Sequence, residues 1–253
     1  MSADIVVAFD FDGVVWDSVD EAFEMAYRAW RDMHGAPSAP KDRLRELFRA
    51  ARWQAKDGHD FYVIMAALSQ DPPRDLAEMP LADFDALREG LDADAEHFVN
   101  DFYEHRRQMR TNDFAGWMAL QRPFPGVAEQ MRRIREQALG VAVATTKDAH
   151  SAERLLETVG VENVQVYGRE VSLDKADHMR AISTQFKVPT SRIVFVEDLL
   201  ENLLPLMPMG VLPVLADWGY NTAAERARAE SLGVTVASVP TLANRVLTCS
   251  RDR

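Results

Sequence analysis

The sequence predicts an α/β protein in which helices cover both faces of a parallel sheet and a helical block follows the first strand. Three observations predict this fold. An apolar run near the N-terminus ends in two aspartates, a long segment with helical spacing follows, and short β-branched runs then alternate with helix-length segments from Pro125-Gly126 onward. Such alternation is typical of parallel sheets that are buried on both faces.

The first strand is predicted over the run that begins at Ile5 and continues into Asp10-Phe11-Asp12-Gly13-Val14-Val15. In an extended chain the side chains of Asp10 and Asp12 point the same way, two residue rises of roughly 3.3 Å apart. A phosphoryl group fits between two such carboxylates. Taken alone, the residues also fit an acidic turn in which Gly13 allows a positive φ.

The next segment reads as helical throughout. Ser18-Val19-Asp20-Glu21 has the spacing of a capping box, which predicts a helix from Ser18 to about Met33. Further helices are expected from Lys41 onward, over Phe61 to Leu68, and over Ala93 to Met109. We therefore expect residues 18–121 to form a helical cap domain, and residues 1–17 and 122–253 to form the α/β domain.

The second half of the chain holds the remaining predicted strands. They are Val141–Thr145, Val164–Tyr167, Ile193–Glu197 and Val211–Leu215. The first strand is expected to join the same sheet. Ligands of open α/β sheets bind outside the carboxyl ends of the strands, and Asp10 and Asp12 fall at such an end.

Polar residues follow the second predicted strand. Thr145, Thr146 and Lys147 offer a hydroxyl and backbone N–H groups just before a helix expected near Ala149. Such a junction suits phosphate binding, although the threonines and Asp148 would also serve as caps of that helix.

The strand that ends at Val196 leads directly into Glu197 and Asp198, with Asn202 shortly after. Adjacent carboxylates at the end of an apolar strand are costly to desolvate unless a cation compensates them. Hard oxygen ligands suit Mg²⁺. The alternative is that Asp198 caps the next helix.

Lys175, taken alone, reads as a solvated side chain.

Together these elements resemble the haloacid dehalogenase superfamily of hydrolases. Asp10 to Val15 matches its first motif, Thr145 the second, Lys175 the third, and Glu197-Asp198 with Asn202 the fourth; Lys175 precedes Asp198 by 23 residues, as in such proteins. The resemblance implies a Rossmann-like parallel-sheet core with an inserted α-helical cap of the first type. Asp217-Trp218-Gly219-Tyr220 resembles a segment of phosphoglycolate phosphatase relatives.

The resemblance also implies roles for the matched residues. Asp10 would attack phosphorus and form an aspartyl-phosphate, and Asp12 would act as acid and then as base. Thr145 and Lys175 would hold the phosphoryl oxygens. Mg²⁺ would be bound by Asp10, the backbone carbonyl of Asp12, Asp198 and, as a further ligand, Glu197. Many relatives have proline where this chain has Ala176, which leaves Lys147 as an alternative to Lys175.

Substrate choice is expected to come from the cap. Arg52, Lys56 and His59 would contact an anionic or polar leaving group, and Thr146 the substrate phosphate. The alternative for this stretch is a charged helix end with Trp53 in the core.

Other functions also fit the motifs. One is a phosphonatase-like C–P hydrolase, for which Lys41 and Lys56 are the only cap lysines, and another is a β-phosphoglucomutase-like phosphotransferase. A third is a catalytically silent binding or regulatory module, because fold alone does not establish activity.

Composition narrows the partners. A net charge of −11 disfavours binding to nucleic acid and to anionic membrane surfaces. The single cysteine, Cys249, excludes an intrachain disulfide, and the apolar runs are too short to cross a bilayer. We expect a cytoplasmic monomer or homodimer that acts on a small phosphorylated metabolite.

Overall fold

The computed structural model describes residues 3–91 and 93–248. It divides the chain into two compact units, which we call the core unit (Met1–Asp17 with Pro123–Arg253) and the helical unit (Ser18–Arg122). Cys249 lies outside the described residues.

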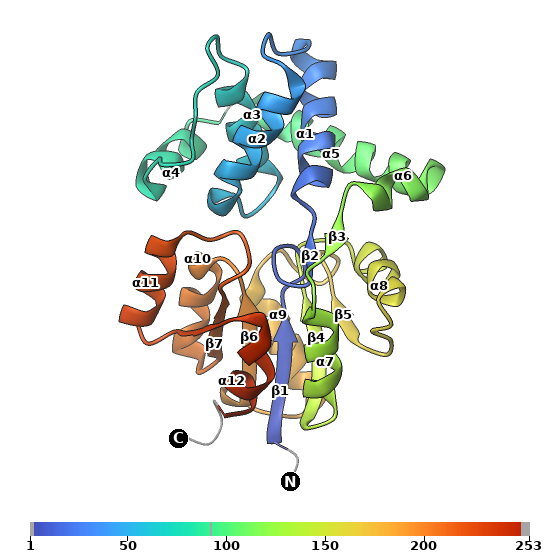
Figure 1. The fold of residues 1–253 in the computed structure, drawn as a ribbon, viewed down its shortest axis with the longest axis vertical. Helices are drawn as coiled ribbons and strands as arrows, with labels where there is room; N and C mark the ends of the chain where they lie inside the picture. Colours follow the sequence, from blue (N-terminus) through green and yellow to red (C-terminus); the bar gives the residue numbers. More distant parts are fainter. Residues whose placement is uncertain (1–2, 92, 249–253) are drawn as a thin grey trace. The chain divides into compact units, whose positions relative to one another are not determined.

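The core unit contains a six-stranded parallel sheet in the order β5-β4-β1-β6-β7-β8 (Figure 1). This sheet confirms the predicted fold class. Its last strand was not predicted, because it is three residues long and only Ala237 of it is buried. The strands are β1 (Ala3–Phe9), β4 (Ala138–Ala144), β5 (Gln165–Tyr167), β6 (Ile193–Glu197), β7 (Leu212–Ala216) and β8 (Thr235–Ala237).

The central strands are apolar because both of their faces are buried. Val6 to Phe9 of β1 and Ile193 to Val196 of β6 have no exposed surface. The register places Phe9 level with Val143 of β4 and with Val196 of β6. The residues that follow these three strands therefore meet at one edge of the sheet.

Helices cover both faces of this sheet. One face packs against α9, α10 and α11, and the other against α7 and α12. The placement follows from right-handed crossovers between parallel strands. The helices are α7 (Val127–Arg135), α8 (Ala149–Thr158), α9 (Lys175–Phe186), α10 (Leu200–Leu203), α11 (Ala223–Ser231) and α12 (Leu242–Thr248), with 3-10 turns η2 (Thr190–Arg192), η3 (Leu204–Met209) and η4 (Val239–Thr241).

The helical unit has no strand within residues 18–91 and 93–121. The two-residue strands β2 (Trp16–Asp17) and β3 (Arg122–Pro123) pair with each other where the chain leaves and re-enters the core unit. The helices are α1 (Val19–His34), α2 (Lys41–Ala51), α3 (Gly58–Leu68), α4 (Leu81–Glu89), α5 (Ala93–Asn112) and α6 (Phe114–Ala119), with the 3-10 turn η1 (Arg52–Gln54).

The predicted capping box at the start of α1 is wrong. Ser18 is the N-cap residue, but its side chain makes no capping hydrogen bond. Glu21 is fully buried, and its carboxylate accepts hydrogen bonds from the Arg106 guanidinium at 2.6 and 2.7 Å and from the Trp117 indole at 3.1 Å. The predicted capping box needs the Glu21 carboxylate at the helix start, but this carboxylate is held by the buried ion pair with Arg106.

Within the described ranges, no helix has the length and hydropathy that a membrane span requires.

Candidate active site

The first acidic motif forms a tight loop just beyond the end of β1. The backbone N–H groups of Val15 and Trp16 both donate to the Phe11 carbonyl at 2.9 Å. Gly13 adopts a φ of +92°, which residues other than glycine rarely adopt. Because β1 ends at Phe9, Asp10 and Asp12 lie in this loop rather than in an extended strand.

Each of the two aspartates pairs with a different lysine. Lys175, the first residue of α9, donates to Asp10 Oδ1 at 2.6 Å and to the Ala144 carbonyl at 2.7 Å. Lys147 donates to the two carboxylate oxygens of Asp12, at 2.9 and 3.3 Å. Both lysines are buried, so neither is the solvated side chain that a lone lysine suggests.

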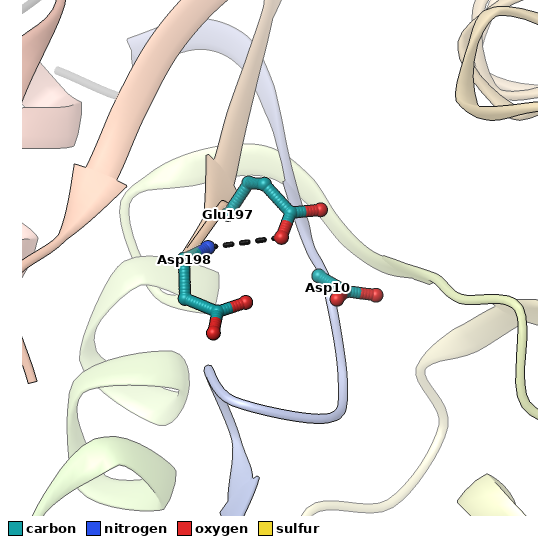
Figure 2. Close-up of side chains that lie close together, drawn as sticks. All are labelled: Asp10, Glu197 and Asp198. Carbon is teal, nitrogen blue, oxygen red and sulfur yellow. Dashed lines mark hydrogen bonds between the residues drawn. The ribbon is translucent and has the colours of Figure 1, made fainter. Parts of the chain in front are cut away.

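Three acidic side chains converge at this edge of the sheet (Figure 2). Asp10, Glu197 and Asp198 each offer a carboxylate oxygen, and these atoms lie within 4.8 Å of one another. All three residues are at least nine-tenths buried. Glu197 ends β6 and Asp10 follows β1, so the adjacency of these two strands brings the carboxylates together.

The Glu197 carboxylate is held by the backbone that follows it. Its Oε1 accepts hydrogen bonds from the N–H groups of Asp198 and Leu199, at 3.0 and 3.1 Å. Its Oε2 is buried and has no hydrogen-bond partner among the described residues; the Lys175 Nζ lies 3.7 Å away. A buried carboxylate oxygen in this state is available to a cation.

Asp198 is held by the loop after β7 and does not cap α10, whose N-cap is Leu199. Its Oδ2 accepts the Tyr220 backbone N–H at 2.7 Å, and its carbonyl accepts the Asn221 side-chain amide at 2.9 Å. The same loop reaches the first motif, because the Trp218 indole donates to the Val14 carbonyl at 2.9 Å.

The electrostatics of the cluster favour uptake of a proton or a cation. Burial raises the pKa of Asp10 to about 7, with a further rise from Glu197 and opposition from Lys175. Burial raises the pKa of Glu197 to about 8, against the attraction of Lys175. Burial also acts to lower the pKa of Lys175, but the charges of Asp10 and Glu197 together outweigh it and raise that pKa.

The donor set fits a hard divalent cation. Mg²⁺ prefers oxygen ligands, and the site brings the carboxyl groups of Asp10, Asp12, Glu197 and Asp198 together with the ammonium groups of Lys147 and Lys175. This gathering of carboxyl groups and the buried Glu197 oxygen without a hydrogen-bond partner match a bound cation. Asp10, Glu197 and Asp198 of the predicted ligand set thus lie together at one edge of the sheet. The Asp12 carbonyl as a ligand and the occupation of the site by metal stay predictions.

The predicted phosphate-binding threonines lie at the same edge. Thr145 directly follows β4 and is buried, with its Oγ1 accepting the Lys147 backbone N–H at 3.1 Å. Thr146 is half-buried. Asp148, not either threonine, caps α8 by accepting the Ser151 N–H at 2.9 Å.

The predicted substrate contacts Arg52, Lys56 and His59 belong to the helical unit. Arg52 is buried, donates to the Ala55 carbonyl and lies over the Phe61 ring. His59 is half-buried, and its ring Nε2 lies 2.9 Å from Glu96. Lys56 is half-buried. Their role in substrate binding stays a prediction.

Sequence reasoning missed two contributions to this site. The sequence predicts a role for the Lys147 side chain only as an alternative to Lys175, whereas in the structure each lysine pairs with one of the two aspartates. It gave no role to Trp218, Tyr220 or Asn221, although the Asp217-Trp218-Gly219-Tyr220 segment had been singled out by resemblance. Aromatic and amide side chains that directly follow an apolar strand are the sequence signal that could have indicated a role for this segment at the site.

Comparison with known proteins identifies the family. The model of the haloacid dehalogenase-like hydrolases matches residues 6–206, which span every acidic and lysine residue of the site. The chain belongs to the haloacid dehalogenase-like hydrolase family. The resemblance inferred from the motifs is thereby confirmed. The prediction that the protein is a hydrolytic enzyme is confirmed with it.

One relative of this hydrolase is similar to it over most of its length. N-acetylmuramic acid 6-phosphate phosphatase of Pseudomonas aeruginosa is 24% identical over 221 residues, which cover 85% of this chain and 82% of that protein.

Two solved structures show the same fold. One, assigned as a phosphoglycolate phosphatase of Lactobacillus delbrueckii subsp. bulgaricus, has a TM-score of 0.71 and 13% identity, covering 97% of this chain and 99% of its own. A haloacid dehalogenase-like family hydrolase of Streptococcus pneumoniae has a TM-score of 0.62 and 16% identity, covering 97% and 100%.

Proposed function

We propose that the protein is a Mg²⁺-dependent phosphatase that hydrolyses a small phosphorylated metabolite through an aspartyl-phosphate on Asp10. The observation that carries this proposal is the separate pairing of the two aspartates. The Asp10 carboxylate lies beside Lys175, Glu197 and Asp198. The Asp12 carboxylate instead forms an ion pair with Lys147. Two carboxylates in different surroundings suit two different tasks in one reaction.

In the first step an Asp10 carboxylate oxygen attacks phosphorus, and the bond from phosphorus to the leaving oxygen breaks. Asp12 donates a proton to that leaving oxygen, so the alcohol departs neutral. The products of this step are the free alcohol and an aspartyl-phosphate on Asp10. Splitting the displacement in this way replaces one difficult step by two easier ones.

In the second step a water molecule attacks the phosphorus of the aspartyl-phosphate. Asp12, now ionised, accepts the proton of that water as the bond from phosphorus to the Asp10 oxygen breaks. Inorganic phosphate leaves, and the Asp10 carboxylate is regenerated. Thr145, directly after β4, and Lys175, the first residue of α9, would hold the phosphoryl oxygens. Bound Mg²⁺, held by Asp10, Asp198, Glu197 and the Asp12 carbonyl, would offset the charge gathered around the phosphoryl group.

The substrate class is proposed to be a phosphate ester of a small hydroxy acid or sugar. Support comes from the relatives, which include a phosphatase of N-acetylmuramic acid 6-phosphate and a protein assigned as a phosphoglycolate phosphatase.

The test is release of inorganic phosphate from a panel of phosphorylated metabolites with Mg²⁺ and with EDTA, beginning with phosphoglycolate and sugar phosphates. Asp10→Asn is expected to abolish turnover. The matched control is Asp177→Asn, an exposed aspartate on α9, which should leave turnover unchanged. Appreciable turnover in the Asp10 variant would remove that residue from the nucleophile role.

A further inference from the structure

Lys147 is a buried lysine directed at one carboxylate of the site. Its side chain has no exposed surface, and its ammonium lies 2.9 and 3.3 Å from the two oxygens of Asp12. The Phe11 ring packs beneath it, with its centroid 5.9 Å from Nζ. Burying a lysine is costly unless its charge is paired, so this contact with Asp12 accounts for its placement.

The backbone of Lys147 is fixed on both sides. Its N–H donates to Thr145 Oγ1 at 3.1 Å, and its carbonyl accepts the Arg169 N–H at 3.1 Å. Asp148, the next residue, caps α8. Lys147 is therefore anchored between the end of β4 and the start of a helix, and its side chain has a defined origin from which to reach Asp12.

We propose that Lys147 is a positioning residue that holds the Asp12 carboxylate in the orientation needed for proton transfer. The inference rests on the proposed function, in which Asp12 gives a proton to the leaving oxygen. A lysine that contacts both carboxylate oxygens restrains both the position and the rotation of the group. Asp12 lies in the loop after β1 and is half-buried, and the contact with Lys147 adds a restraint on its side chain.

This role differs from that of Lys175. Lys175 contacts Asp10 and lies 3.7 Å from Glu197, on the side of the nucleophile and the acidic pair. Lys147 contacts Asp12, the group that handles the proton. Loss of Lys147 should therefore lower kcat/KM most for substrates whose leaving group must be protonated.

The experiment compares two kinds of phosphate ester in Lys147→Met and in the wild-type enzyme. An alkyl phosphate such as phosphoglycolate needs its leaving oxygen protonated, whereas 2,4-dinitrophenyl phosphate releases a stable phenolate. The value of kcat/KM reports formation of the aspartyl-phosphate in both cases. Lys147→Met should lower it at least about tenfold for the alkyl ester, and about threefold or less for the aryl ester.

Three further variants make the result specific. Lys147→Arg keeps a charged donor and should recover part of the loss with the alkyl ester. In an Asp12→Asn background, Lys147→Met should cost nothing more, because its effect passes through Asp12. Lys41→Met removes a lysine that pairs with Glu24 at 2.7 Å in the helical unit, and it is the control for losing an ion pair.

Two results would overturn the role of Lys147. One is an equal loss with both esters that persists in the Asp12→Asn background, and the other is a rise in KM alone, which would assign Lys147 to binding the phosphoryl group. Should Lys147→Met fail to fold, Lys147→Gln, which also removes the charge, carries the same comparison, and Lys147→Arg stays the variant that keeps it. An inactive wild-type protein would overturn the proposed function itself, whereas an active one with an unaffected Lys147→Met variant overturns only this inference.

Discussion

Gly219 lies so close to Asp198 that no side chain fits between them. A Cβ at position 219 would lie 2.2 Å from Asp198 Cβ and 2.5 Å from the Gly13 carbonyl oxygen. A Cβ at Gly13 would in turn lie 2.1 Å from Asp198 Oδ2. The proposed metal ligand is thus seated between two glycines that come from loops far apart in the sequence.

Gly219→Ala is expected to displace Asp198 and to weaken Mg²⁺ binding. Overpacking of this kind costs about 1–3 kcal/mol in the free energy of unfolding, and it would move a carboxylate that we propose as a metal ligand. Thermal unfolding with and without Mg²⁺ measures both effects, and the Mg²⁺-dependent rise in Tm should shrink. Gly90→Ala is the control, since the nearest atom to a Cβ there is 3.6 Å away. An undiminished Mg²⁺ response would contradict the prediction.

Binding of Mg²⁺ should release protons at neutral pH. Folding raises the pKa of Asp10 from 3.8 to about 7 and that of Glu197 from 4.5 to about 8. The metal-free folded state therefore holds protons that the unfolded chain has lost. The contribution of the two carboxyls to stability is greatest below their ordinary pKa values and falls as pH rises through the raised ones.

Calorimetric titration with Mg²⁺ at pH 7, in buffers of different ionisation enthalpy, measures this release. We expect about one proton per bound ion, decreasing to none well above the raised pKa values. Glu197→Gln should reduce the number. Absence of proton release at pH 7 would mean that both carboxyls are already ionised in the metal-free protein.

The buried pair of Glu21 and Arg106 should dominate the stability of the helical unit. Arg106 joins α5 to α1 through two short hydrogen bonds, and its removal leaves a carboxylate that is fully buried. Arg106→Met is expected to cost about 3–5 kcal/mol in the free energy of unfolding. Chemical denaturation measures this cost.

The control for this pair is Arg107→Met on the same helix. Arg107 pairs with Glu104 at 2.5 Å, but both side chains are exposed, and the substitution should leave the midpoint of denaturation unchanged. A similar loss in both variants would show that the buried pair is no more important than a surface one.

Patterns within short stretches predicted much of the fold. The β-branched runs and the helical spacing indicated the parallel sheet and the inserted helices, because burial on both faces of a strand leaves a continuous apolar run. The capping box at Ser18 failed for a different reason. Glu21 has the right spacing for a local hydrogen bond, but a guanidinium 85 residues away takes its carboxylate instead.

The sequence by itself determined which chemistry is present: two aspartates after the first strand, a threonine and two lysines after later elements, and an acidic pair after another strand. Only the tertiary structure decided how these groups pair. The order β4-β1-β6 brings their strand ends to one edge, and there Lys175 contacts Asp10 while Lys147 contacts Asp12. A charge in a buried site pairs with the partner nearest in space, and that distance depends on strand order and loop path rather than on separation along the chain.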